Sequence, residues 1–158
     1  MTETTATVLV KGASQKARNL VNYRLRSESE LRTRLSQHFD DATIDAAISQ
    51  MYREGLLDDT RFAYWFVETK THSRPISATM IRQQLLRAGI NSDLAKSITS
   101  EVKDQKNALQ VAIKRSRAIS HLPKRDFHHK MQQYLARRGF SFEVISTAVE
   151  ESWDLLPQ

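Results

Sequence analysis

Residues 55–63 read Gly-Leu-Leu-Asp-Asp-Thr-Arg-Phe-Ala, and this stretch ends one helical segment and begins the next. Gly55 follows a run with helical apolar spacing, so we expect it just past a helix end, in the left-handed conformation that glycine adopts most easily. Asp58 or Asp59 then caps the following helix by accepting hydrogen bonds from the free N–H groups of its first turn. The apolar residues at i, i+3 and i+4 are expected to form the buried face of that helix: Phe62, Ala63, Trp65 and Phe66.

The same helix-start signals occur on both sides of this stretch. Ser27 and Glu30 have the spacing of a capping box, in which each side chain accepts a hydrogen bond from the backbone N–H group of the other residue. Asp40 or Asp41 is expected to cap a further helix, and Ser141 the last one. Only four Gly and three Pro occur in 158 residues, which favours long helices joined by short connections.

The helical pattern has a period of 50 residues. Leu31, Ile81 and Met131 are 50 residues apart, and so are Gly89 and Gly139. Self-similarity at such a period is typical of repeat proteins, in which small units bury their apolar faces against their neighbours. We therefore expect an all-α fold, an elongated array of three stacked three-helix repeats.

The expected boundaries follow from this period and from the helix start and stop signals. The three repeats are expected at residues 14–57, 58–105 and 106–153. Residues 1–13 lack helical periodicity and are expected to form a mobile N-terminal tail, and residues 154–158 a C-terminal tail.

Composition limits the compartment and the kind of partner. The sequence has no Cys, which excludes disulfides and thiolate metal sites and is compatible with a reducing compartment. No apolar run approaches the roughly 18 residues of a membrane span, so we expect a soluble, cytoplasmic protein. The net charge of +6 and the pI of about 9.8 point to a polyanion or to an acidic protein surface as the partner.

The charge alternates along the chain. Residues 11–34 carry seven basic and two acidic side chains, whereas residues 40–59 carry one basic and six acidic ones. Residues 103–138 are again basic, with ten Lys or Arg against two Asp. Stacked repeats would therefore expose a basic stripe, which predicts weak DNA binding without base readout or contact with an acidic protein surface. Sixteen side chains are the candidates for this contact: Arg24, Arg26, Arg32, Arg34, Lys70, Arg74, Arg82, Arg87, Lys114, Arg115, Arg117, Lys124, Arg125, Lys130, Arg137 and Arg138.

No set of residues predicts catalysis, a metal or a cofactor. Asp58 and Asp59 are explained as helix caps, and adjacent positions in a helix diverge. His128 and His129 form a doublet without a partner four residues away. Four scattered Gly cannot form a phosphate loop. We expect no catalytic residues, no metal, no cofactor and no enzyme activity.

The sequence resembles the RecX family, the regulators of the RecA recombinase. Residues 55–63 carry the most specific part of the resemblance, and Glu30-Leu31 with Leu35 is similar to the opening helix pair of the family. The second and third units are similar through Arg74, Ile81, Leu85, Gly89-Ile90 and Arg138-Gly139-Phe140. The first unit departs from the pattern because no Gly precedes Phe39. The motif residues are Gly55, Leu56, Leu57, Asp58, Asp59, Arg61, Phe62, Ala63, Gly89 and Gly139.

The resemblance implies a non-enzymatic, monomeric modulator that binds the RecA nucleoprotein filament. Such proteins restrain filament growth and suppress ATP hydrolysis, strand exchange and coprotease activity, and they bind single- and double-stranded DNA weakly. The implied setting is DNA repair, homologous recombination and the SOS response. The alternative is a free-standing helical DNA-binding module of the helix-turn-helix type, which predicts one recognition helix and sequence-selective duplex binding.

Overall fold

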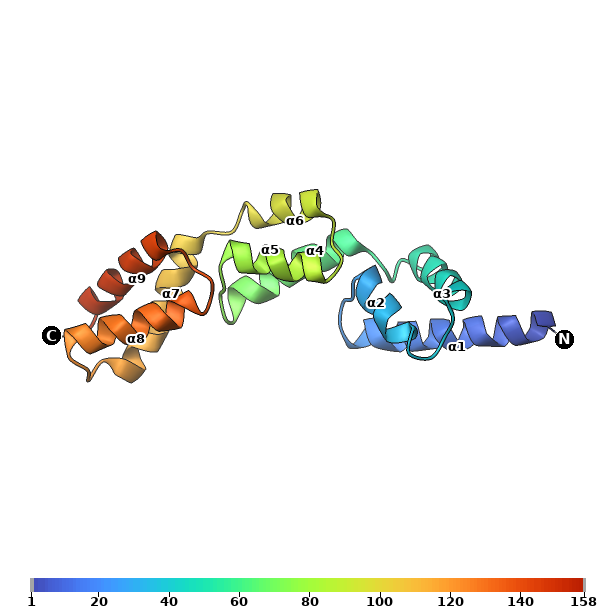
Figure 1. Ribbon diagram of the computed structural model, residues 1–158, viewed down its shortest axis with the longest axis horizontal. Helices are drawn as coiled ribbons and strands as arrows, with labels where there is room; N and C mark the ends of the chain where they lie inside the picture. The colour runs from blue at the N-terminus through green and yellow to red at the C-terminus, as the bar shows by residue number, and fades with distance from the viewer. Residues whose placement is uncertain (1, 158) are drawn as a thin grey trace. The chain divides into compact units, whose positions relative to one another are not determined.

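The computed structural model describes residues 2–157, and within that range it contains nine α-helices and no strand. Figure 1 shows them in chain order, and the all-α prediction is confirmed. Helices α1–α3, α4–α6 and α7–α9 form three successive helix triplets. Their bounds are α1 (Thr2–Tyr23), α2 (Glu28–Leu35), α3 (Asp41–Arg53), α4 (Asp59–His72), α5 (Ala78–Arg87), α6 (Ser92–Thr99), α7 (Asp104–Ile119), α8 (Lys124–Ala136) and α9 (Phe142–Asp154).

The helices are distributed over two compact units. The first unit contains the residues up to Trp65 together with Leu85–Leu94, and the second contains Phe66–Gln84 together with the residues from Ala95 onwards. Each helix of the middle triplet therefore contributes residues to both units.

Helix α1 begins earlier than expected. It starts at Thr2, whereas we expected residues 1–13 to form a mobile tail; residue 1 lies outside the described residues. Burial explains the difference, because Ala13 and Ala17 are fully buried while Val8 is 62% and Leu9 42% exposed. The first turns of α1 thus carry no buried face, and a helix without a buried face leaves no apolar periodicity in the sequence.

The predicted helix ends are confirmed at the level of single hydrogen bonds. Ser27 and Glu30 form the capping box at the start of α2, and the side chain of Asp40 accepts from the N–H group of Thr43 at the start of α3. Ser141 caps α9 in the same way. The three expected helix-terminating glycines all have positive φ: Gly55 (68°), Gly89 (81°) and Gly139 (84°).

Two apolar cores hold the first and the third helix triplet, α1–α3 and α7–α9. The core in the first unit is formed by Leu31, Leu35, Ile44, Ile48, Met51, Ala17 and Leu57. The core in the second unit is built around Phe127, Met131 and Leu135, onto which α7 and α9 pack with Ala112, Val149 and other apolar residues. Each fully buried side chain of this size stabilises the fold by about 1.5–3 kcal/mol.

The prediction for the buried face of α4 is only partly right. Phe62 and Ala63 are fully buried, as expected. Trp65 and Phe66 are only partly buried, and each has a cation over its ring, Arg24 at 5.8 Å and Lys70 at 5.2 Å. An indole or phenyl ring attracts a cation to its face, so each of these rings contacts a positive charge and does not fill the core.

Corresponding contacts recur at the ends of the second helix of successive triplets. The Ser27 hydroxyl donates to the carbonyl oxygen of Ala88 over 2.6 Å, and the Ser77 N–H group donates to that of Arg138 over 3.0 Å. Both residues of the first pair lie 50 positions before those of the second. Gly89 and Gly139 allow this close approach, because a Cβ atom on Gly139 would lie 2.6 Å from the Ser77 hydroxyl oxygen.

Candidate anion-binding surface

The sixteen candidate side chains differ in whether an acid neutralises them. Arg24 is bound through two N–H groups by Glu30, with the shorter contact at 2.9 Å. Arg32 pairs with Glu28 at 2.9 Å and with Asp45 at 2.6 Å. A carboxylate held this close neutralises a guanidinium group. Arg24 and Arg32 therefore form ion pairs within the first unit.

The other two candidates on α2 and its preceding loop are less constrained. Arg34 is exposed. Arg26 is partly buried, and its Nε is buried without a hydrogen-bond partner among the described residues. Burial and the neighbouring charge of Arg24 lower the pKa of Arg26 from its usual value.

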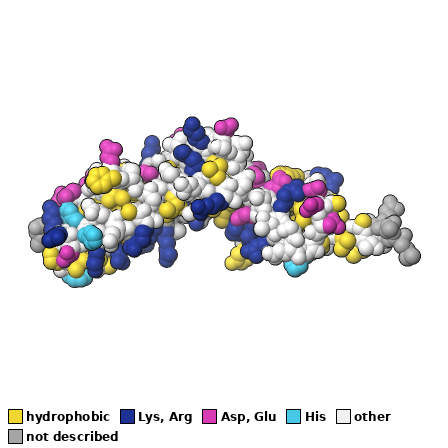
Figure 2. All heavy atoms as spheres, in the orientation of Figure 1, with side chains coloured by type: hydrophobic (Ala, Val, Ile, Leu, Met, Phe, Trp, Pro, Cys, Tyr) yellow, Lys and Arg dark blue, Asp and Glu magenta, His cyan; other side chains and the backbone are white. Residues whose placement is uncertain are grey.

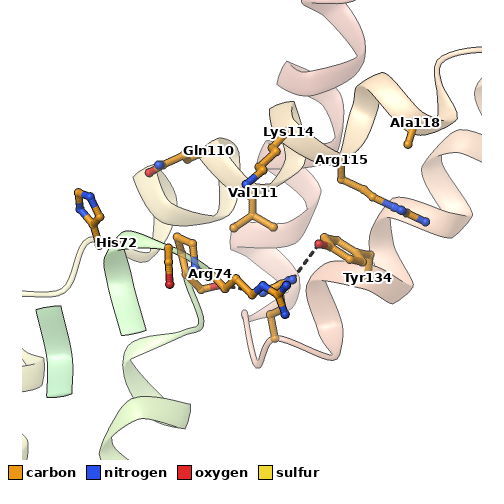
Figure 3. Close-up of a pocket in the computed structure, with 11 residues that line it drawn as sticks. His72, Arg74, Gln110, Val111, Lys114, Arg115, Ala118 and Tyr134 are labelled. Atoms are coloured by element: carbon orange, nitrogen blue, oxygen red, sulfur yellow. Dashed lines mark hydrogen bonds between the residues drawn. The ribbon is translucent and has the colours of Figure 1, made fainter. Parts of the chain in front are cut away.

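The second unit contains a hollow of about 460 Å³ between the α4–α5 connection and helices α7 and α8 (Figure 3). Five of its lining residues are basic or carry an imidazole, and none of its lining residues is acidic. On the face shown in Figure 2, Lys and Arg side chains gather along the lower side of helices α7–α9. The lining residues are His72, Ser73, Arg74, Pro75, Gln110, Val111, Lys114, Arg115, Ala118, Tyr134 and Arg138.

Tyr134 organises the basic side chains of this hollow. Arg138 Nη2 donates to the Tyr134 hydroxyl oxygen over 2.8 Å, and the guanidinium carbon lies 4.6 Å from the ring centroid. The guanidinium carbon of Arg115 lies 5.2 Å from the same ring. These cation–π contacts hold two positive charges at one aromatic ring, and no acid among residues 2–157 forms a salt bridge with either of them.

Arg138 is also held from the α4–α5 connection. Its Nη1 donates to the carbonyl oxygen of Pro75 over 3.5 Å, while its Nε is buried without a hydrogen-bond partner among the described residues. A buried N–H group without an acceptor costs free energy, so the contacts of the two Nη groups hold Arg138 in place against this cost.

The remaining candidates lie outside this hollow. Lys70 lies over the ring of Phe66, and Arg82 Nε donates to the Thr99 hydroxyl over 3.1 Å. Lys124 contacts Glu150 at 3.7 Å, with both side chains more than half exposed, a pair of little energetic value. The other basic candidates are exposed: Arg87, Arg117, Arg125, Lys130 and Arg137.

The acidic residues of the motif have structural roles. Asp58 Oδ1 accepts from the N–H group of Arg61 over 3.0 Å and so caps its own helix, α4. Asp59 Oδ1 accepts from the N–H group of Glu28 over 2.9 Å and caps α2. Partial burial raises the pKa of Asp59 above its usual value, which the hydrogen bond from Glu28 opposes. Within the described part of the chain, no group of three or more His, Cys, Asp or Glu is arranged to hold a metal ion.

Tyr134 is the residue of this surface that the sequence analysis missed. The aromatic residues with an expected position were Phe62, Trp65 and Phe66, on the buried face of α4, and Tyr134 was not among the candidate side chains. The available signal was the i, i+4 spacing of Tyr134 and Arg138, which brings the two side chains together where α8 ends and the chain turns before Gly139. Arg115 reaches the same place through the packing of α7 against α8, and Arg74 through the position of the α4–α5 connection. Neither approach carries a local signal in the sequence.

The fold and this surface define a class: an all-α protein of three-helix repeats with an unneutralised basic hollow. Two family models match the chain, the first three-helix domain of RecX over residues 13–51 and the third three-helix domain of RecX over residues 103–149. Together these segments span more than half of the 158 residues. The chain belongs to the RecX family.

Individual relatives agree with this assignment. The "Regulatory protein RecX" of Clostridioides difficile is 28% identical over 142 residues, covering 88% of this chain and 67% of the relative. That of Chlorobium phaeobacteroides is also 28% identical, covering 89% of this chain and 93% of the relative. The crystal structure of RecX from Lactobacillus salivarius has a TM-score of 0.74 at 24% identity, covering 95% of this chain and 99% of that one, which shows the fold. No helix in the described range is long and apolar enough to cross a membrane.

Proposed function

We propose that this protein is a non-enzymatic regulator that binds the RecA nucleoprotein filament and inhibits RecA. Family membership supports the regulatory role, since the relatives are regulatory proteins RecX. The activities inhibited would be filament extension, DNA-dependent ATP hydrolysis, strand exchange and coprotease activity. Its DNA contact would be weak and independent of sequence.

Apart from family membership, one observation supports the proposal: the hollow around Tyr134 is lined by basic residues and by no acidic one. Arg115, Arg138 and Lys114 gather there without an acidic residue among the lining residues. Acidic protein surface and DNA phosphate both complement such a patch, and a RecA filament offers both. Inhibition would then follow from occupied space, with no chemical step.

RecA's DNA-dependent ATP hydrolysis tests the proposal, with the protein added before or after filament assembly. We expect a concentration-dependent loss of hydrolysis that is stronger when the protein is present before assembly. The combined charge reversal K114E, R115E and R117E should raise the concentration needed for half inhibition by about tenfold, because it opposes the polyanion electrostatically. The helix content, measured by circular dichroism, should stay unchanged because all three side chains are exposed.

Two results would contradict the proposal. A wild-type protein that leaves RecA hydrolysis unchanged at any concentration would refute the function. A triple variant that inhibits at the wild-type concentration would refute only the role of Lys114, Arg115 and Arg117, and would leave the proposed function standing.

A further inference from the structure

We propose that the hollow around Tyr134 is a phosphate-binding site for the backbone of single-stranded DNA. This inference rests on the proposed function, and it assigns the proposed DNA contact to this hollow. The four basic side chains that would hold the phosphate groups are Arg74, Lys114, Arg115 and Arg138, all of which line the hollow.

The donors of this site are held in position before a ligand arrives. Arg138 is fixed by the Tyr134 hydroxyl, by the Tyr134 ring and by the Pro75 carbonyl oxygen. Each Nη group of a guanidinium carries two N–H bonds, and these contacts use one hydrogen of each group. Arg115 is held over the same ring. A guanidinium group fixed in this way loses little conformational entropy when it binds a phosphate through two N–H groups.

The arginine of the first unit that corresponds to Arg74 is neutralised by an acid. Arg24 lies 50 positions before Arg74, and Glu30 lies 50 positions before Met80. Glu30 binds Arg24 through both carboxylate oxygens, whereas Met80 offers Arg74 no charge. One carboxylate is thus enough to satisfy this arginine position, and in the part of the chain that the structure describes no acid forms a salt bridge with Arg74.

The number of charges favours a DNA strand over a carboxylate of a protein partner. A single carboxylate needs one guanidinium group, as Arg24 and Glu30 show. Four basic side chains around one hollow match a polymer whose negative charges repeat along the chain. The volume of about 460 Å³ falls within the range of small-ligand sites, so it accommodates a nucleotide unit. Bases of an unpaired strand can stack on the exposed guanidinium plane of Arg115 in the way they stack on arginine in other single-strand sites.

The test is the affinity for a labelled oligothymidylate of about 20 nucleotides, measured by fluorescence anisotropy without RecA. The variant R74Q/R115Q removes two exposed positive charges from the hollow. We expect it to weaken binding by about tenfold at about 50 mM salt and to reduce the slope of log affinity against log salt by about 1.4, since each lost phosphate contact on a single strand contributes about 0.7.

The matched control is K96Q/K103Q, which removes two exposed positive charges from the same unit, away from the residues that line the hollow. We expect it to weaken binding by less than about threefold, because it changes only the net charge. A second arm adds ATP or inorganic phosphate as competitor, compared with potassium chloride at equal ionic strength. We expect neither to displace the oligonucleotide at micromolar concentration, because a small phosphate ligand makes fewer contacts than a strand whose charges repeat.

Equal losses in the two double variants, or wild-type binding by R74Q/R115Q, would overturn the phosphate site. Displacement by ATP at micromolar concentration, lost in R74Q/R115Q, would overturn the assignment to DNA and give the hollow to a free nucleotide. Each of these results leaves the proposed inhibition of RecA standing, since that is tested by ATP hydrolysis in a separate assay.

Discussion

Asp104 Oδ1 accepts a hydrogen bond from the backbone N–H group of Ala78 over 2.9 Å. The first residue of α7 therefore caps the first residue of α5. The same arrangement joins Asp59, the first residue of α4, to Glu28, the first residue of α2, also over 2.9 Å. In both places the carboxylate at the start of one triplet satisfies a free N–H group in the triplet before it, where a negative charge also favours the helix dipole.

Replacing Asp104 with Ala should lower the free energy of unfolding by about 1–2 kcal/mol, because the Ala78 N–H group loses its acceptor. Asp93→Ala is the control, since Asp93 lies in the first turn of α6 and is exposed; its cost should stay within about 0.5 kcal/mol. Urea unfolding followed by circular dichroism measures both. Equal costs would show that the cap contributes nothing beyond a surface charge.

The three helix-terminating glycines should differ in their tolerance of a methyl group. Gly55 (φ 68°) has no neighbouring atom within 4 Å of an added Cβ, so Gly55→Ala should cost about 1–2 kcal/mol from the backbone conformation alone. A Cβ on Gly139 would lie 2.6 Å from the Ser77 hydroxyl oxygen and 3.1 Å from Met80 Cβ. Gly139→Ala should therefore cost about 1–3 kcal/mol more than Gly55→Ala. Urea denaturation midpoints compare the two, and a Gly139 variant as stable as the Gly55 variant would contradict the close contact.

The pair of Arg18 and Glu54 should make the stability of the first unit depend on acid pH. Arg18 donates to both carboxylate oxygens of Glu54, at 2.7 and 2.9 Å. These hydrogen bonds, together with one from the Gln50 side chain, lower the pKa of Glu54 from 4.5 to about 2. Because the folded pKa is the lower one, the stabilisation is complete above about pH 4.5 and is lost as the pH falls towards 2.

Arg18→Gln should accordingly be less stable than wild type at neutral pH, with the difference shrinking between pH 4.5 and pH 2. Urea midpoints measured across that range give the comparison. Lys11→Gln removes an exposed charge that has no contact with Glu54, so its difference from wild type should not follow the same curve. A constant Arg18→Gln difference down to pH 2 would exclude the ion pair as its cause.

Glu30→Gln should increase the affinity for single-stranded DNA by about two- to threefold, because it removes the carboxylate that neutralises Arg24. Glutamine can still accept the hydrogen bond of the capping box, so α2 should keep its start. Glu101→Gln, at an exposed position of the second unit, changes the net charge by the same amount and serves as the control. Equal gains in both variants would mean that net charge alone governs the affinity.

The features that the sequence predicted correctly are local. Ser27, Asp40 and Ser141 cap helices within three residues of their own position, and Gly55 ends a helix because of its own backbone freedom. Residue type and short spacing are sufficient information for such features. The 50-residue period also lies in the sequence, because it is a property of apolar positions.

The features that the sequence did not predict depend on packing. Asp59 accepts its hydrogen bond from a residue 31 positions away. The sequence around Asp59 therefore does not predict that it caps α2. Trp65 and Phe66 have the spacing of a buried face, but the middle triplet covers them only in part. The site around Tyr134 needs α7, α8 and the α4–α5 connection at one place, and basic residues in a solvated helix face have the same pattern as basic residues in a binding site.

The Arg24–Glu30 pair bears on how many triplets could engage one strand. In the first triplet a single acid six residues after the arginine pairs with it, whereas none of the residues that line the proposed site is acidic. The proposed contact would therefore gain no avidity from an equivalent contact in the first triplet. Such a contact would stay weak and would be exchanged quickly.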